Sequence, residues 1–448
     1  MSIAKSLDIK LAKIRANPSC REFIIADAKD ADMAHGIGAP GKSPEHYSQE
    51  GKFRTMPEFC EIIRQIVHQG LVDIMLMSAY VNDRLTIQER LFDNSHVTPA
   101  ARANDTTDIH VIRGGVFTSQ PSLPFRTTTI DHIQCGHIDC ADNERIRGAN
   151  LGLYSVTFNN DAERDRHTLQ EYKEFRIEAE RKGFRHFLEV FDANAPVNPI
   201  PSDKFGGFVN DIIVRTLGGV PEAGRPLFLK MVYHGPKWME ELCRFDPTLI
   251  VGILGGSAGT TYDAFKLIAE AQKYGAKVAL FGRKINYSEN QLAFIEMLRR
   301  IVDGQISPEE AVRAYHGILQ GLGIKPLRSL EEDMKLQTNV MSYSSSGVVV
   351  PQTHEPAGAR PAAAPPPAHV ERGAGSSVPR PTETAQPSRS TAATSRPTTP
   401  AAPPKTAAAE ATPGAKLDFP RKADGSPDFA RMTPSQRLAY HRSRLAAL

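Results

Sequence analysis

Up to about residue 340, the chain repeats one pattern: a short apolar run followed by a longer amphipathic stretch. The short runs have the length of strands, and the amphipathic stretches have the length of helices. This alternation is typical of βαβ units, in which helices connect parallel strands and cover their sheet. Seven runs are predicted strands: Phe23–Asp27, Val72–Ser78, Leu151–Phe158, Phe184–Phe191, Pro226–Val232, Thr248–Leu254 and Lys277–Phe281.

A longer segment, residues 108–140, separates the second of these runs from the third. Two stretches in it, His110–Phe117 and Thr127–Gln134, are candidates for an eighth strand with an inserted hairpin. Eight strands with helices in roughly 300 residues fit an α/β fold, the (β/α)8 TIM barrel. A doubly wound open sheet is the alternative, but no Gly-x-Gly-x-x-Gly follows the first strand. Three amphipathic stretches are predicted helices: Asp161–Lys182, Thr260–Tyr274 and Ser288–Asp303.

The C-terminal part of the chain has a different composition, which predicts a barrel over residues 1–340 and a separate tail. Residues 345–420 are mostly Pro, Ala, Thr, Ser and Gly, and we expect a disordered linker because such a segment buries too little apolar surface. In residues 421–448, Thr433-Pro-Ser-Gln436 resembles a capping box and predicts a short amphipathic helix. A short tethered helix would fold on a partner, for recruitment or encapsulation, and a frayed tail is the alternative.

Charge, hydropathy and cysteine content limit the cellular setting. No apolar run approaches the roughly eighteen residues of a membrane span, and the N-terminus lacks the apolar core of a secretion signal. Five scattered cysteines do not form a disulfide framework, so we expect a cytoplasmic protein. The excess of basic residues lies in the tail, and the remainder shows no basic stripe, which argues against nucleic acid as a partner.

The most informative residue is Lys230, which interrupts the apolar run Leu227–Val232 near the end of a predicted strand. In a barrel, functional residues gather at the C-terminal ends of the strands. A buried ammonium is costly, so burial favours the neutral amine, which is a nucleophile for carbonyl carbons. A lysine that is ion-paired inside the barrel is the alternative interpretation.

Carboxylates stand at two other strands. Asp27 lies where the first apolar run stops, and Glu189 lies inside the run Phe184–Phe191. Both are candidate proton carriers at the mouth of the barrel. Lys29 is a rival nucleophile, but its neighbours Asp27 and Asp30 would keep it protonated, so we expect it to be an ion-pair partner.

The last two strands end in sequences that suit an anion. Gly255, Gly256 and Ser257 form a glycine-rich turn before a predicted helix, and such a turn presents backbone N–H groups to a phosphate. Gly282 and Arg283 follow the eighth strand and bring a cation to the same side. Loops after strands seven and eight are where phosphate sites of this fold recur.

Four of these segments, Phe187–Glu189, Phe228–Val232, Gly255–Ser257 and Gly282–Arg283, stand in an order that resembles one enzyme superfamily. It is the class I aldolases of the deoxyribose-phosphate, tagatose-bisphosphate and archaeal-type fructose-bisphosphate kinds, and the chain resembles a divergent member over about residues 20–325. The resemblance implies a barrel in which Lys230 forms an iminium with the substrate. It also implies that Asp27 is the aspartate of strand one and that Glu189 is the carboxylate of the tagatose-type branch.

The expected function is therefore a metal-independent class I aldolase without a cofactor, acting on a sugar phosphate or related keto compound. A homo-oligomer is expected, as is common for such barrels. One alternative is an inactive barrel that binds a phosphorylated ligand and recruits a partner, or a protein shell, through its tail. Another is metal-assisted lyase chemistry through Cys135, His137 and Cys140, which offer soft ligands for zinc. A polar loop at the barrel mouth is the simpler interpretation of that segment.

Overall fold

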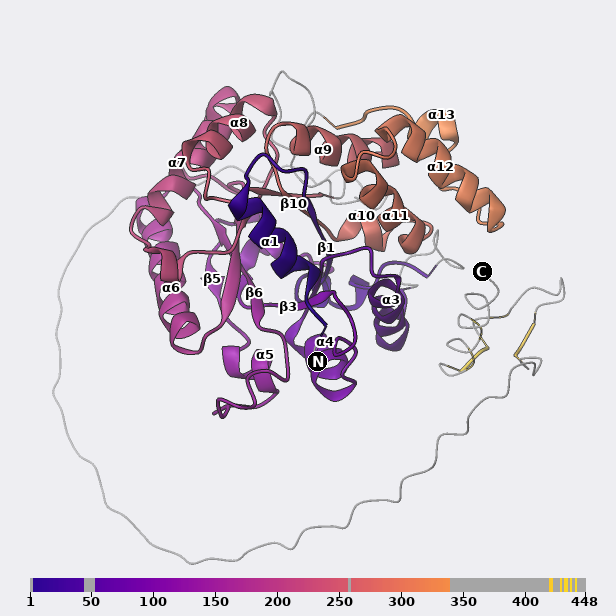
Figure 1. The fold of residues 1–448 in the computed structure, drawn as a ribbon, viewed down its shortest axis with the longest axis horizontal. Helices are drawn as coiled ribbons and strands as arrows, with labels where there is room; N and C mark the ends of the chain where they lie inside the picture. Colours follow the sequence, from indigo (N-terminus) through magenta and orange to yellow (C-terminus); the bar gives the residue numbers. More distant parts are fainter. Residues whose placement is uncertain are drawn as a thin grey trace, which may run out of the picture. The chain divides into compact units, whose positions relative to one another are not determined.

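Figure 1 shows the computed structural model, which describes residues 3–43, 53–256 and 259–338 and scattered positions between 419 and 440. The predicted linker, apart from its last two residues, and most of the C-terminal peptide lie outside the described residues. Thr433 and Gln436 are described. Each donates its backbone N–H to the other's side chain, at 3.0 and 3.2 Å, and these are the reciprocal bonds of the predicted capping box.

Eight parallel strands close into a barrel, which confirms the predicted fold class. Neighbouring strands pair in chain order, and the last strand pairs with the first, with Ile24 opposite Val278. Each of the seven predicted runs overlaps one observed strand. The barrel strands are β1 (Ile24–Lys29), β2 (Ile74–Met77), β3 (Thr98–Arg102), β6 (Leu151–Thr157), β7 (Arg185–Phe191), β8 (Leu229–Met231), β9 (Gly252–Leu254) and β10 (Val278–Phe281).

Helices surround the barrel, and the three predicted ones are present as α6 (Ala162–Arg181), α9 (Thr261–Lys273) and α11 (Gln291–Val302). The start of α6 is set by Asp161, whose carboxylate accepts from the two backbone N–H groups of residues 163 and 164 at 3.0 and 2.8 Å. The other helices are α1 (Ser6–Ala16), α2 (Asp32–His35), α3 (Met56–Gln69), α4 (Ala79–Asn82), α5 (Ile130–Cys135), α7 (Phe205–Leu217), α8 (Pro236–Phe245), α10 (Arg283–Asn286), α12 (Pro308–Gly321) and α13 (Leu330–Asp333).

The strands divide their side chains between the lumen of the barrel and the helical layer. In β1, Ile24, Ala26 and Ala28 belong to an apolar cluster with contributions from strands all around the barrel, which is the lumen. Ile25 belongs to a second cluster shared with the helices. Because successive strand residues point to opposite faces, this assignment fixes the direction of every other residue of β1.

One end of the lumen is filled by α1, a helix that precedes the first strand and that was not predicted. Its residues Leu7, Leu11 and Ile14 are buried in the lumen cluster with Ile24 and Leu151, which begin β1 and β6. In Figure 1, α1 lies across the barrel. The N-terminal end of the lumen is therefore apolar and filled, and its polar residues lie toward the C-terminal ends of the strands.

The prediction of an eighth strand within residues 108–140 is wrong. The missing strand is β3, Thr98–Arg102, which comes earlier in the chain and contains too few large apolar residues to be recognised. The insertion instead holds a short antiparallel pair, β4 (Asp105–Thr106) with β5 (Pro124–Phe125), and the helix α5. Among the residues described, no helix has both the length and the apolar character needed to cross a membrane.

Candidate active site

Polar side chains fill the lumen at the C-terminal ends of the four adjoining strands β3, β6, β7 and β8, and just after β1. Each is found by counting in steps of two from an apolar lumen residue: Ala28 leads to Asp30, Ala100 to Arg102, Leu153 to Ser155, Phe187 to Glu189 and Phe228 to Lys230. All five side chains are buried. The alternation that builds the apolar floor of the barrel thus also gathers the candidate site.

The centre of this cluster is an ion pair between Lys230 and Glu189. The Nζ of Lys230 lies 2.5 Å from Oε1 of Glu189, and the two residues are register partners on β8 and β7. Lys230 is 7% exposed and Glu189 is 1% exposed. Directly beneath them, the rings of Phe187 and Phe228 stack with centroids 4.6 Å apart, so the pair stands on an aromatic floor.

The second oxygen of Glu189 is held from the other side. The hydroxyl of Ser155 donates to Oε2 of Glu189 at 2.7 Å, and Arg102 in turn donates to the Ser155 hydroxyl at 3.0 Å. Arg102 also lies 3.6 Å from Oε2 of Glu189. The carboxylate is therefore fixed between two cations and a hydroxyl, with one oxygen directed at the Lys230 amine.

Arg102 connects this pair to the first strand. Its Nε donates to Oδ2 of Asp30 at 2.6 Å. Burial opposes the charge on Arg102, but the carboxylates of Asp30 and Glu189 outweigh that effect and raise its pKa. The guanidinium stays charged and ties two carboxylates together, so it organises the floor of the site.

Two more nitrogen-bearing side chains, those of Arg283 and His35, stand at the rim. Arg283 begins α10, and burial lowers its pKa although the nearby Tyr287 and Glu189 oppose the shift. His35 ends α2, and burial together with the charge of Arg283 lowers its pKa, against the effect of Asp30. Both are half-buried. The mouth therefore combines a lysine–carboxylate pair in the lumen with positive charge above it.

Asp27 is not brought to this cluster, which differs from the expectation. β1 continues to Lys29, so Asp27 alternates with the lumen residues Ala26 and Ala28 and faces the helical layer. There it pairs with Lys29 at 2.6 Å, and both side chains are fully buried. Burial raises the pKa of Asp27 and lowers that of Lys29. The expected ion pairing of Lys29 is confirmed, and the lumen position of this strand's end belongs to Asp30.

The structure describes four of the five predicted phosphate residues. Gly255 and Gly256 follow β9, and Gly282 and Arg283 follow β10, while Ser257 lies outside the described residues. Packing explains the glycine at position 255, because a Cβ there would lie 2.1 Å from the ring of Phe281. Gly256 turns the chain at φ +59°.

The N-terminus of α9, which was expected to present its N–H groups to a phosphate, is already occupied by carboxylates of this chain. Asp263 accepts from the backbone N–H of Thr260 at 2.6 Å, and Asp333 accepts from that of Thr261 at 2.8 Å. An anion at this helix end would compete with both. The turn at Gly255–Gly256 and the Arg283 side chain remain as the candidate anion contacts.

The cysteine–histidine segment lies toward the N-terminal ends of the strands, at the opposite end of the barrel from the mouth. It lies in the connection from β3 to β6, and Asp131 of α5 pairs at 3.0 Å with Lys182, which comes between the end of α6 and the start of β7. Gln134, at the end of α5, bonds to Asn150 at 3.0 Å, immediately before the strand begins. The interpretation of this segment as a loop at the mouth is therefore wrong. Cys135 and Cys140, which were considered as zinc ligands, form a disulfide with each other.

Comparison with known proteins finds similarity only among solved structures. No protein-family model and no curated protein matches the sequence. A crystal structure of an archaeal fructose 1,6-bisphosphate aldolase is 14% identical, covers 66% of this chain and 99% of its own, and has a TM-score of 0.45. An archaeal fructose-1,6-bisphosphate aldolase whose catalytic lysine carries a carbinolamine intermediate is 16% identical, with coverages of 65% and 99% and a TM-score of 0.45.

A third match is a fructose-bisphosphate aldolase from Slackia heliotrinireducens, which is 14% identical, covers 69% of this chain and 90% of its own, and has a TM-score of 0.49. The structural neighbours thus include aldolases of the kind that the sequence motifs resemble. At these sequence identities and TM-scores, the neighbours do not indicate the activity or the substrate of this chain. What the site does follows from this chain's own residues.

Proposed function

We propose that this protein is a class I aldolase, a lyase that cleaves or forms a carbon–carbon bond through a Schiff base on Lys230. The observation that carries this proposal is the contact between Lys230 and Glu189, 2.5 Å apart in the lumen, with Glu189 held by Ser155. When Glu189 takes a proton from Lys230 across this contact, a neutral amine is left beside a protonated carboxyl group. That is the pair of groups that iminium formation requires.

The chemistry proceeds in balanced steps. The Lys230 amine adds to the substrate carbonyl to give a carbinolamine, and Glu189 donates a proton to its hydroxyl, which leaves as water. The iminium then withdraws the electron pair of the scissile carbon–carbon bond while a base takes the proton of the neighbouring substrate hydroxyl. An aldehyde departs, and the enamine is protonated and hydrolysed to return the free lysine.

Proton transfer of this kind contributes on the order of 10²–10⁴-fold to rate. We assign it to Glu189 and, from the first strand, to Asp30 in place of Asp27. Asp30 is bound to Arg102, which also approaches Glu189, so the two carboxylates belong to one connected network. Asp27 is enclosed with Lys29 on the other face of the same strand and has a stabilising role.

The proposed substrate is a phosphorylated ketose or a related keto compound. Arg283 and the turn at Gly255–Gly256, with Ser257 beside it, would hold the anionic group at the rim and so place the carbonyl over Lys230. The expected cytoplasmic location, homo-oligomer and partner for the C-terminal peptide belong to the same proposal. A pull-down with residues 417–448 fused to a reporter tests the partner, and recruitment of no protein would leave the peptide as a spacer.

Turnover tests the enzyme directly. Wild-type protein is incubated with a panel of phosphorylated ketoses, and the released aldehyde is measured with a coupled dehydrogenase. We expect release from at least one ketose, loss of it in Lys230→Met, and no change in Lys204→Met, which alters an exposed lysine after β7. A Lys230→Met variant with full turnover would eliminate the mechanism.

A further inference from the structure

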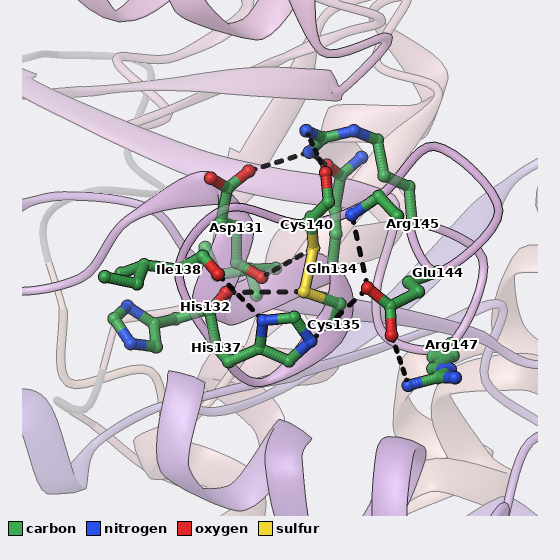
Figure 2. The surroundings of a disulfide bond; sticks show 12 residues. Asp131, His132, Gln134, Cys135, His137, Ile138, Cys140, Glu144, Arg145 and Arg147 are labelled. Carbon is green, nitrogen blue, oxygen red and sulfur yellow. Dashed lines mark hydrogen bonds and ion pairs between the residues drawn. A yellow bond between two sulfur atoms is a disulfide. The ribbon is translucent and has the colours of Figure 1, made fainter.

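The segment from Cys135 to Glu144 forms a small, closely folded loop at the opposite end of the barrel from Lys230. Helix α5 ends at Cys135, and Gly136 continues the chain at φ +87°, followed by Asp139 at φ +56°. These two left-handed positions reverse the chain and bring Cys140 back, with its Cα 6.1 Å from that of Cys135. Figure 2 shows the resulting disulfide and the side chains around it.

The imidazole of His137 is oriented as a ligand. Its Nδ1 lies 2.8 Å from the carbonyl oxygen of Ile138, and a carbonyl only accepts, so Nδ1 carries the proton. Nε2 faces Oε2 of Glu144 at 3.4 Å, and in the neutral ring it is the nitrogen that can bind a metal. In Figure 2 the ring lies beside the Cys135 sulfur and faces the Glu144 carboxylate. A proton fixed on one ring nitrogen by a carbonyl is the usual arrangement of a metal-ligating histidine.

Glu144 is fixed independently of the histidine. Its Oε1 pairs with Arg147 at 2.8 Å, and its Oε2 accepts from the backbone N–H of Ala141 at 3.2 Å. The same oxygen, Oε2, is the one that faces the His137 ring. The sulfur of Cys135, a ring nitrogen of His137 and an oxygen of Glu144 all lie within 4.8 Å of one another.

The separation between His137 and Glu144 can be compared with the dimensions of a tetrahedral zinc site. With zinc bonds of about 2.0–2.1 Å to nitrogen and oxygen and about 2.3 Å to sulfur, ligand atoms stand about 3.4 Å apart for N and O and about 3.6 Å for N and S. The observed 3.4 Å between His137 and Glu144 already has that value. The Cys135 sulfur lies within 4.8 Å of both of these atoms, and Cys140, which is bonded to Cys135, is the fourth ligand.

We propose that Cys135, His137, Cys140 and Glu144 form a zinc site that opens and closes with the redox state of the two cysteines. A dithiol reductant gives two electrons and two protons to the disulfide, and it becomes a disulfide itself. The two thiols then release two protons as Zn²⁺ binds their thiolates, the neutral imidazole and the carboxylate. In the oxidised protein the sulfurs are bonded to each other, and the site does not hold the metal.

The role of this site is to hold the approach to β6 rather than to act on substrate. The backbone N–H of Gly148 bonds to the carbonyl of Gln134 at 2.7 Å, so the loop is closed just before the strand that carries Ser155. Either the disulfide or the zinc ion ties the two ends of the loop together. The site is therefore independent of Lys230, and a Lys230→Met variant keeps it intact.

The test uses the full-length protein and Co²⁺ as a spectroscopic substitute for zinc. The protein is reduced with a phosphine, freed of reductant without oxygen and titrated with Co²⁺. We expect one equivalent to bind, with the intense visible bands of a tetrahedral ion and the near-ultraviolet absorption of thiolate ligands, and both to vanish when Zn²⁺ is added. Oxidised protein should give neither signal.

Substitution of His137 and Glu144, which are exposed and half-buried respectively, keeps the test informative without touching the cysteines. His137→Asn and Glu144→Gln should each weaken Co²⁺ binding about tenfold or more, since removing a ligand costs at least as much as removing a group that supports one. The control is His132→Asn, an exposed histidine of α5 that bonds to Thr129 at 2.9 Å, and it should bind as wild type does. Reduced protein that binds no Co²⁺, or binding that is unchanged in both ligand variants, overturns the proposal.

Discussion

Replacing Glu189 with glutamine is the perturbation that reports most on the proposed site. The carboxylate lies 2.5 Å from Lys230, 2.7 Å from the Ser155 hydroxyl and 3.6 Å from Arg102. An amide of the same shape keeps one accepting oxygen, so it can satisfy Ser155 or Lys230 but not both, and its NH2 group then faces a donor.

The expected cost to stability follows from those contacts. Lys230 and Arg102 lose a buried negative charge, and breaking a buried pair from one side costs about 3–5 kcal/mol. The double variant Glu189→Gln with Lys230→Met removes both charges, so it should be less destabilised than the sum of the single changes. A coupling free energy of about 2–3 kcal/mol, at the upper end for residues in contact, is expected.

The assays are denaturant unfolding of the four proteins and release of aldehyde by those that are folded. Glu189→Gln should lose turnover by on the order of 10²–10⁴-fold under conditions in which it remains folded. A coupling energy near zero, or a folded Glu189→Gln protein with wild-type turnover, would refute the reasoning that this pair is both the structural and the chemical centre of the lumen.

Three further predictions concern neighbouring groups. Ser155→Ala leaves the buried Oε2 of Glu189 without its hydroxyl donor, so the free energy of unfolding should fall by about 1–3 kcal/mol. Turnover should fall while KM changes little. An unchanged free energy of unfolding would contradict the role of this hydrogen bond. Asp27→Asn should destabilise the protein by about 3–5 kcal/mol, because Lys29 loses its buried partner. The folded fraction should still form the Schiff base at Lys230. Loss of that adduct in folded protein would show that Asp27 belongs to the active site. Burial lowers the pKa of His186 to about 3, so below the ordinary value of 6.5 the folded state binds fewer protons than the unfolded state. The free energy of unfolding is therefore highest above pH 6.5 and should fall by about 2 kcal/mol between pH 6.5 and 5. A His186→Gln variant with the same dependence of stability on pH would contradict this.

The sequence predicts the barrel well because its strands are apolar on both faces and its helices are charged on one. The strand that was missed, β3, reads Thr-Pro-Ala-Ala-Arg, and its alanines give no hydrophobic run to detect. Its alanines are buried on both faces, Ala100 in the lumen and Ala101 against the helical layer, and this burial is evident only in the assembled fold. Arg102, at the end of β3, was missed with it.

Within the site, Lys230 and Glu189 were found because a charge inside an apolar run is conspicuous. Ser155 gives no such signal, and only the alternation from Leu153 places it in the lumen. Asp27 was misplaced because the first strand was ended two residues early, at the first polar side chain. The buried pairing of Asp27 with Lys29 lets the strand continue to Lys29. A helix such as α1, which fills the bottom of the barrel, is recognisable only once the lumen exists.

The most direct test of the central claim is borohydride trapping followed by intact-mass analysis and peptide mapping. The protein is treated with borohydride in the presence of phosphorylated ketoses, aldehydes and dihydroxyacetone phosphate. The account predicts a substrate-sized mass increase on the peptide that contains Lys230, and none on the peptide that contains Lys29. An adduct at Lys29, or no adduct with any carbonyl compound in a normally folded protein, would contradict it.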